Sequence, residues 1–138
     1  MAESILLRIL TPDRLLLEAE VEEMTAPGSV GEFGVLPNHV SFVSSLAVGE
    51  ASYRHEGRKR YLAVGGGFAE VLDNVVTLLV PSAEFAEEID EARALKERNE
   101  AEAALEKLSP EDAEFARSAL RLALAEVRLQ VASRSQAR

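Results

Sequence analysis

All eight glycines of this chain lie between Gly28 and Gly67, and the last 71 residues contain none. Glycine suits tight turns and close contacts between strands, and it weakens a helix by about 1 kcal/mol relative to alanine. The uneven distribution therefore predicts two architectures in one chain. Short strands joined by turns come first, and glycine-free helices follow.

The first part of the chain consists of short apolar and β-branched segments separated by turn signals, such as Thr11-Pro12-Asp13, Glu56-Gly57-Arg58 and Asp73-Asn74. Strands at intervals of about 8 to 12 residues, with no helical period between them, are typical of an all-β sandwich or barrel. Residues 1–82 are therefore predicted to form an N-terminal antiparallel β-sandwich. The expected strands are Ser4–Ile9, Arg14–Val21, Val40–Leu46, Ala51–His55, Arg60–Val64, Gly67–Leu72 and Val75–Val80.

After Pro81 the hydrophobic period becomes that of a helix. Acidic residues at Glu87, Glu88, Asp90 and Glu91 load its first turns, where the helix dipole favours negative charge. This helix is expected to end near residue 108. Its expected apolar positions are Phe85, Ile89, Ala92, Leu95, Ala103, Ala104 and Leu108.

A second helix is expected to begin with Ser109 as its N-cap and Pro110 at its first position. Residues 85–134 are therefore predicted to form a C-terminal antiparallel α-helical hairpin, and the chain is an α+β protein with the two classes in separate halves. The apolar face expected on the second helix consists of Ala116, Leu120, Ala123, Leu124, Val127 and Val131.

The two helical segments carry opposite charge. Residues 84–114 hold 12 acidic and 4 basic side chains, net −8, whereas residues 115–138 hold 5 basic and 1 acidic, net +4. Opposite charge favours antiparallel docking, but exposed ion pairs contribute only about 0.2 to 1 kcal/mol each. Because alanine-rich faces also bury little area, the hairpin is expected to be able to open without global unfolding.

Composition argues against several function classes. A net charge of −9 disfavours a nucleic-acid surface, and a chain with no cysteine and only two histidines does not suggest a metal cluster. Ser41, Ser44 and Ser45 lie near His39, but no G-x-S-x-G elbow is present, so no catalytic residues are assigned. The start of the sequence lacks the pattern of a secretory signal, and no apolar run approaches the roughly 18 to 20 residues of a membrane helix. A cytosolic protein is expected.

The triplet Gly65-Gly66-Gly67 allows two interpretations. It lacks the G-x-G-x-x-G spacing of a phosphate-binding loop, and the strand pattern FAEVLD follows it in place of a helix. A β-bulge or close packing between strands is therefore favoured over a phosphate site.

The densest cluster of conformationally restricted residues is TAPGSVGEFGVLPNHVSFVSSL, from Thr25 to Leu46, and it is expected to form a structured loop between strands. Its pattern P-G-x-x-G-x-x-G-[VI]-L-P-x-H resembles that of the epsilon subunit of bacterial F-type ATP synthases. The downstream VGGGFAEV and the helical C-terminal third also match in order and spacing, so the resemblance covers the whole chain.

The resemblance implies a non-catalytic subunit of the rotating central stalk, which couples proton flow to ATP synthesis. It implies that the sandwich docks on the gamma subunit and on the ring of c subunits, at the cytoplasmic side of the bacterial inner membrane and peripheral to it. His39, Val40 and Ser41 become candidate contacts with gamma, whereas the residues alone favour a loop histidine that caps a backbone group. Asn38 departs from the glycine of many relatives.

The string Ile89-Asp90-Glu91-Ala92-Arg93-Ala94 is most simply explained by an ion pair between Asp90 and Arg93. It also resembles the [IL]-D-x-x-R-A pattern with which some epsilon subunits bind ATP. The implied ATP contacts are Glu84, Asp90, Arg93 and Arg128, and Arg can hold phosphate oxygens bidentately. Leu124 replaces the second of two arginines, so weakened affinity is expected. No cofactor is required, and ATP is a possible regulator.

The resemblance further implies that the folded hairpin permits turnover. When extended, it would bring Arg117, Arg121 and Arg128 near the alpha/beta catalytic head and inhibit ATP hydrolysis. The composition fits one alternative equally well, a free-standing β-sandwich that binds other proteins and carries a helical oligomerisation hairpin. An enzyme of unknown type is a distant third.

Overall fold

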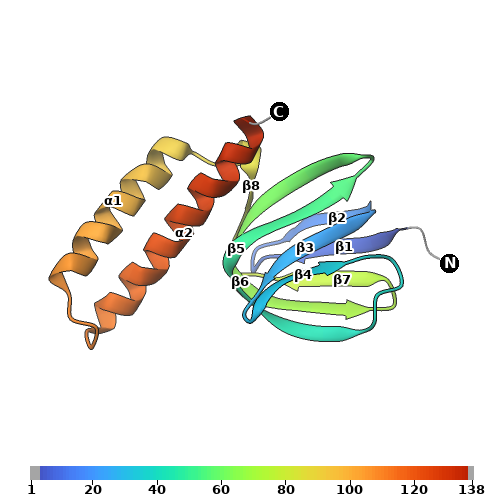
Figure 1. Ribbon diagram of the computed structural model, residues 1–138, viewed down its shortest axis with the longest axis horizontal. Helices are drawn as coiled ribbons and strands as arrows, with labels where there is room; N and C mark the ends of the chain where they lie inside the picture. Colours follow the sequence, from blue (N-terminus) through green and yellow to red (C-terminus); the bar gives the residue numbers. More distant parts are fainter. Residues whose placement is uncertain (1–3, 137–138) are drawn as a thin grey trace.

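The computed structural model describes residues 4–136 of the chain. Strands occupy the N-terminal part, and a two-helix hairpin follows (Figure 1). The elements are β1 (Ile5–Leu10), β2 (Leu15–Val21), β3 (Glu23–Gly28), β4 (Gly31–Val35), β5 (Phe42–His55), β6 (Arg58–Leu72), β7 (Val75–Leu79), β8 (Ala83–Phe85), the 3-10 turn η1 (Ala86–Glu88), α1 (Glu91–Lys107) and α2 (Ala113–Gln136).

The strands follow the order β2-β1-β7-β6-β5-β3-β4, and β8 pairs with β6. The long strands β5 and β6 take part in both layers of the sandwich. The segment Phe68–Leu72 of β6 pairs with β7, which pairs in turn with β1, whereas Leu62–Val64 of β6 pairs with β8. All pairs are antiparallel except β1 with β7, which is parallel. The predicted sandwich and hairpin are thus confirmed, with this one parallel pair as an addition.

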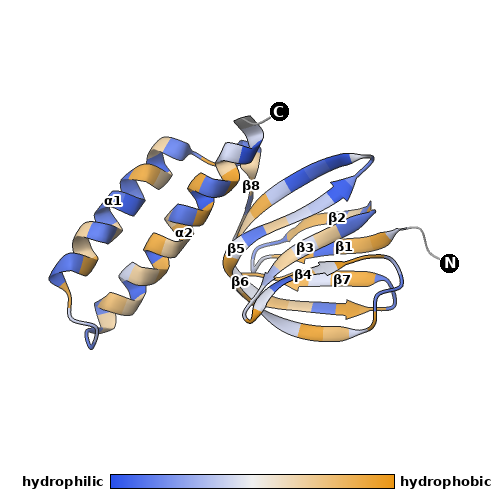
Figure 2. Cartoon of the chain, viewed as in Figure 1, coloured by the Kyte–Doolittle hydropathy of each residue, from blue (hydrophilic) through white to orange (hydrophobic). Residues whose placement is uncertain are grey.

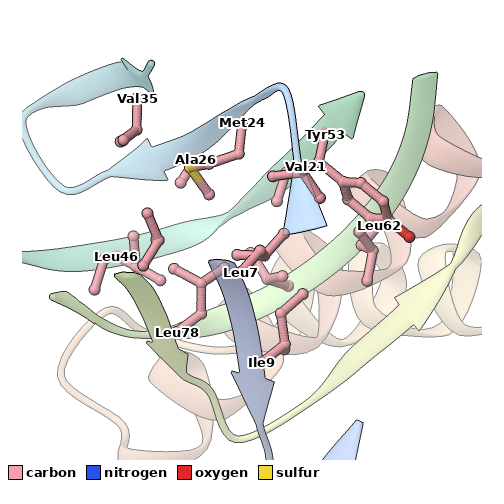
Figure 3. Packing of buried hydrophobic residues seen from close by; sticks show 14 of the residues in the cluster. Leu7, Ile9, Val21, Met24, Ala26, Val35, Leu46, Tyr53, Leu62 and Leu78 are labelled. Carbon is pink, nitrogen blue, oxygen red and sulfur yellow. The ribbon is translucent and has the colours of Figure 1, made fainter. Parts of the chain in front are cut away.

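The core lies between the two layers (Figure 3). Alternate residues of β1 point into it, because successive side chains of a strand lie on opposite faces. Ile5, Leu7 and Ile9 are each at most 1% exposed. They meet residues of the opposite layer such as Met24 and Leu62, which are also buried. Apolar area buried in this way stabilises the sandwich by about 25 cal/mol per Å².

The segment from Thr25 to Val35, expected to be a loop, is instead a hairpin of β3 and β4. Its glycines mark the turn, where Gly28 pairs with Gly31. Pro27 lies within β3, opposite Glu32 of β4. Proline has no backbone N–H to donate to the sheet, so its presence argues against a strand when only the sequence is considered. Between Thr25 and Leu46, residues 29–30 form the turn of this hairpin and residues 36–41 form a loop, and β5 begins at Phe42 rather than at Val40.

The four strands expected between residues 40 and 72 merge into two. β5 and β6 pair from Phe42 opposite Val71 to His55 opposite Arg58, as one long hairpin with the predicted turn at its tip. The glycine triplet lies inside β6, which supports close strand packing over a phosphate loop. Gly67 has φ of +109°, and a Cβ there would lie 2.1 Å from the carbonyl oxygen of Leu79. A glycine is therefore required where β6 bends toward β7.

The helix boundaries differ from prediction at their N-terminal ends. Phe85 belongs to β8, and α1 begins only after Asp90, whose side chain accepts a hydrogen bond from the backbone N–H of Arg93. The predicted end near residue 108 is confirmed, since Leu108 is the C-cap. Ser109 is not the N-cap of α2. It forms a turn with Asp112, whose carboxylate accepts from the backbone N–H of Ser109, and α2 starts at Ala113.

The predicted apolar faces of the helices are partly wrong. In α1 the buried residues are Ala94 and Ala101, whereas Leu95 is exposed, as are the predicted core positions at 92 and 103. In α2 the buried residues include Ser118 and Ala125, whereas Leu120 is exposed. Alanine and serine allow the two helices to pack closely, so the larger leucines lie outside the contact. Figure 2 shows α1 as a mostly hydrophilic helix.

The hairpin is folded against the sandwich. Helix α2 lies between α1 and the strands, and it contacts β5, β6 and η1 (Figure 1). Leu62, Ala63 and Val64 are buried in succession, because Leu62 and Val64 face the core while Ala63 packs in a cluster with Val131 of α2 and Ala86. Neither α1 nor α2, nor any other helix among residues 4–136, has the length and hydrophobicity needed to cross a membrane.

Candidate functional site

The four residues that the resemblance implies as ATP contacts line one pocket in the structure. Glu84 comes from β8, Asp90 and Arg93 from the start of α1, and Arg128 from α2. The pocket measures about 340 Å³. Its remaining lining residues are Glu88, Ile89, Ala94 and Glu97. The fold thus brings together residues that lie up to 44 positions apart in the sequence.

Each side chain has a local reason for its position. Asp90 caps α1 and accepts from the backbone N–H of Arg93 at 3.1 Å, which satisfies one of the free donors at the helix start. Glu88 accepts from the backbone N–H of Phe85 at 3.3 Å. The pocket is therefore built around a helix N-terminus whose capping group is already supplied by the chain.

Both guanidinium groups are paired with carboxylates. Arg93 Nε donates to Glu97 at 3.1 Å, Arg128 Nε donates to Glu84, and Arg128 Nη1 lies 3.6 Å from Glu97. The predicted ion pair between Asp90 and Arg93 is replaced by the backbone cap and by the Arg93–Glu97 pair. The lining contains four carboxylates and two guanidinium groups, so the pocket is acidic in the absence of a ligand.

Leu124, which replaces the second expected arginine, does not line this pocket. Its Cδ2 atom lies 3.6 Å from the point that a Cβ atom would occupy at Gly65 of β6. This position of α2 faces the sandwich at Gly65. Arg128 is consequently the sole basic residue that α2 contributes to the lining.

The three arginines assigned to the inhibitory face differ in their environments. Arg117 pairs with Glu114 of its own helix, and this hydrogen bond raises the pKa of its guanidinium. Arg121 lies 3.5 Å from Glu100 of α1, and Arg128 lies near Glu97 of α1. In the folded hairpin, two of the three arginines are therefore paired with carboxylates of α1, in agreement with the opposite charges of the two segments.

One contact between the hairpin and the sandwich was not foreseen. Arg134, in the last turn of α2, donates to both carboxylate oxygens of Glu50 in β5, at 2.9 and 3.0 Å. The hydrogen bonds to Glu50 raise the pKa of the Arg134 guanidinium. Its guanidinium also lies 5.2 Å from the ring centre of Tyr61. A bidentate pair that stacks on an aromatic ring is stronger than a simple surface pair. No local motif signals it, because the partners are 84 residues apart.

The candidate gamma contacts lie in the loop between β4 and β5. Val40 is 74% exposed, and His39 Nδ1 lies 2.7 Å from the carbonyl oxygen of Val40. The residue-level interpretation of His39 as a backbone cap is therefore correct, and its ring also lies 5.2 Å from that of Phe42. The loop is tied to the turn after β6, because Asn38 and Asn74 hydrogen bond to each other.

An exposed apolar patch continues from this loop onto the sheet. We call Val43, Phe68 and Leu79 the apolar patch; they lie on β5, β6 and β7 and line one hollow of about 200 Å³. These side chains are between 53% and 71% exposed, in strands whose alternate residues are buried. Contiguous exposed apolar surface marks interaction sites. The sequence signal was available, since apolar residues on both faces of a strand indicate that both faces are covered.

A larger hollow of about 570 Å³ lies between the β5–β6 turn and η1. Arg60 pairs there with Glu87 at 3.5 Å and stacks on Phe85 at 5.1 Å. Burial raises the pKa of the nearby Tyr53 hydroxyl. These contacts join the sandwich to the start of the hairpin. Among residues 4–136, no group of three or more histidine, cysteine, aspartate or glutamate side chains is arranged to hold a metal ion.

Two family models together match almost the whole chain. The model described as "ATP synthase, Delta/Epsilon chain, beta-sandwich domain" matches residues 4–86, and that described as "ATP synthase, Delta/Epsilon chain, long alpha-helix domain" matches residues 87–133.

Curated relatives agree with these matches over their full length. The chain is 44% identical to the ATP synthase epsilon chain of Geotalea uraniireducens over 135 residues, which cover 98% of each chain. It is 47% identical to that of Nitratidesulfovibrio vulgaris over 131 residues, which cover 94% of this chain and 98% of the relative.

Solved structures give the same result. A chain in the cryo-EM structure of the Euglena gracilis mitochondrial ATP synthase, which includes the c ring, is 32% identical and superposes with a TM-score of 0.83. The match covers 96% of this chain and 83% of that chain. A chain of the central stalk and c ring of the Tetrahymena thermophila enzyme shares the fold at 13% identity and a TM-score of 0.58, with 94% of each chain covered.

Proposed function

Since this chain belongs to the delta/epsilon chain family of ATP synthases, we propose that it works as a non-catalytic subunit of the rotating central stalk. In this role the sandwich docks on the gamma subunit and on the c ring, below the alpha/beta catalytic head, and helps to couple proton flow to ATP synthesis. In a bacterial cell the complex places it at the cytoplasmic side of the inner membrane, peripheral to the bilayer. Family membership disfavours the alternative of a free-standing binding module.

The observation that carries the docking proposal is the apolar patch beside the His39 loop. Val40 and Val43 are both more than 70% exposed. The loop between β4 and β5, which contains Val40, is held in place by the hydrogen bond between Asn38 and Asn74. A patch on a rigid sheet loses little conformational entropy on binding, so most of the free energy gained by burying its apolar side chains contributes to the affinity. We assign His39, Val40 and Ser41, together with the apolar patch, to the contact with gamma.

The folded hairpin supports a regulatory role for α1 and α2. Its apolar contact with the sandwich is small and is made by residues such as Ala63, Ala86 and Val131. Ion pairs such as Arg134–Glu50 supplement it. A contact of this kind can be released without unfolding the sandwich. Release from the sandwich, followed by separation of α1 from α2, would free Arg121 and Arg128 from the carboxylates of α1. They and Arg117 could then reach acidic segments of the catalytic head and inhibit ATP hydrolysis.

Truncation after Glu88 tests the division into a docking domain (1–82) and a regulatory hairpin (85–134). We expect the fragment to retain a β-type circular dichroism spectrum and a cooperative melt, because β8 and Phe85, which packs on the core, remain. It should bind gamma within about twofold of the full chain, since the apolar patch is untouched. The reconstituted complex should hydrolyse ATP several-fold faster.

Truncation after Val80 is the matched variant, because it also removes β8 and Phe85. We expect it to melt at a lower temperature than the longer fragment. An unfolded fragment ending at Glu88 would contradict the independent sandwich. A folded fragment with unchanged hydrolysis would contradict the regulatory role while leaving the docking role intact.

We further propose that the pocket of Glu84, Asp90, Arg93 and Arg128 binds ATP when the hairpin is folded. Two arginines from different helices suit a triphosphate, and carboxylates can accept from ribose or adenine donors. Binding has to displace the carboxylates now paired with the arginines, so the affinity should be low. A ligand that binds only the folded state shifts the equilibrium toward it.

Addition of ATP to the full chain should raise its melting temperature. At about ten times the dissociation constant the rise should be about 5 °C, which corresponds to roughly 1.4 kcal/mol of linkage. Arg128→Ala should abolish the rise, whereas Arg117→Ala should keep it, because Arg117 lies outside the pocket lining. Differential scanning fluorimetry measures this. The absence of any shift at millimolar ATP would refute the nucleotide site and leave the stalk role standing.

A further inference from the structure

We infer that Glu97 is a built-in competitor for this pocket: its carboxylate occupies the arginines that an anionic ligand needs and closes the hairpin without one. The inference rests on the proposed function in one respect, since it concerns the pocket assigned above to ATP. It adds a residue of α1 that no part of the ATP-binding pattern contains.

The first observation is geometric. Glu97 contacts both arginines of the pocket, one from its own helix and one from α2. Its Oε1 atom accepts from Arg93 Nε at 3.1 Å, and its Oε2 atom lies 3.6 Å from Arg128 Nη1. The carboxylate therefore bridges α1 and α2 between two guanidinium groups, which are groups that also bind phosphate oxygens.

The second observation is burial. The side chains of Glu97 and Arg128 are 25% and 24% exposed, whereas that of Arg93 is 78% exposed. Charges that are partly shielded from water interact more strongly than fully exposed ones. The Glu97–Arg128 contact is therefore the main part of the bridge, and Arg93 contributes less. Arg128 is held from its other side by Glu84, which fixes the guanidinium toward the pocket.

The third observation is the charge balance. The lining holds Glu84, Glu88, Asp90 and Glu97 against two arginines. A polyphosphate that enters this pocket meets excess negative charge and has to separate Glu97 from Arg128. Replacement of Glu97 by its neutral isostere removes one repelling charge and the carboxylate that both arginines share, and Arg128 keeps its pair with Glu84. Among residues 4–136, no other carboxylate of the lining pairs with both guanidinium groups.

The test compares Glu97→Gln with Glu100→Gln in the full chain. Glu100 lies on the same helix, contacts Arg121 of α2 at 3.5 Å and is outside the pocket lining, so both variants lose one negative charge and one contact between the helices. Binding of ATP and of inorganic tripolyphosphate is measured by calorimetry at constant ionic strength. Hydrogen exchange of α1 and α2 is measured without ligand.

We expect Glu97→Gln to bind tripolyphosphate and ATP about tenfold more tightly than Glu100→Gln. Without ligand, its amides around residues 93–97 and 128 should exchange several-fold faster than in the unmodified chain. If only tripolyphosphate binds more tightly, the internal competitor stands and the nucleotide proposal fails. If Glu97→Gln binds neither anion more tightly than Glu100→Gln does, the inference is overturned.

Discussion

Gly67→Ala should lower the free energy of unfolding of the sandwich by about 4 kcal/mol or more, a large part of the 5 to 15 kcal/mol typical of a domain. Two effects add at this position. The backbone has φ of +109°, where side chains with a Cβ are strained, and the new methyl group would lie 2.1 Å from the carbonyl oxygen of Leu79. That oxygen belongs to the backbone of β7, which pairs with β6, so it cannot move without breaking the sheet.

Gly57→Ala is the matched control for this prediction. Gly57 also has a positive φ, of +78°, but no atom lies within 4 Å of the added Cβ. Only the conformational strain of about 1 to 2 kcal/mol should remain. Urea denaturation followed by circular dichroism measures both values. Equal losses for the two variants would show that the close approach of β6 and β7 does not constrain the fold.

The fold class was predictable because turn residues and strand-forming segments alternate in the first half of the chain. The turns at Glu56-Gly57 and Asp73-Asn74 lie where the sequence places them, with positive φ at all four residues. The length of β5 and β6 was not predictable. Glycine normally ends a strand pattern, but the glycines of β6 bend a strand that continues through both layers, and only pairing with β5 keeps it continuous.

The helical faces were predicted less well for a physical reason. A periodic pattern assumes one buried stripe, but α2 is contacted by α1 on one side and by the sandwich on another. Leu124 and Val131 contact the sandwich side, whereas Ser118 and Ala125 are buried although neither has the size that a hydrophobic pattern emphasises. Close packing of the helices selects small residues, so the leucines at 95 and 120 remain exposed.

The pocket shows the same division. The resemblance named Glu84, Asp90, Arg93 and Arg128, and the fold brings these four residues together. Glu97 was not named, because its contact with Arg128 depends on how α1 and α2 align, which no local pattern encodes. The partner of Arg134 depends likewise on where α2 ends against β5.

Phe68→Asp should weaken docking on gamma by more than 100-fold, which corresponds to roughly 3 kcal/mol, the loss typical of a central aromatic residue in an interface. Phe68 lies between Ser45 of β5 and Leu79 of β7, so its ring is central in the apolar patch. A carboxylate there would be buried against an apolar partner without a counter-charge. Because Phe68 is 59% exposed in the isolated chain, the melting temperature should change little.

Leu120→Asp is the control for the loss of an exposed apolar side chain, since Leu120 is 51% exposed but lies on α2, outside the apolar patch. Its binding to purified gamma, measured by calorimetry, should match that of the unmodified chain. If both variants bind normally, the apolar patch is not the docking surface, and the His39 loop alone would have to carry the contact. If Phe68→Asp fails to bind while its melting temperature is retained, the defect lies in recognition, because a sandwich that still melts cooperatively has kept the strands that present the patch.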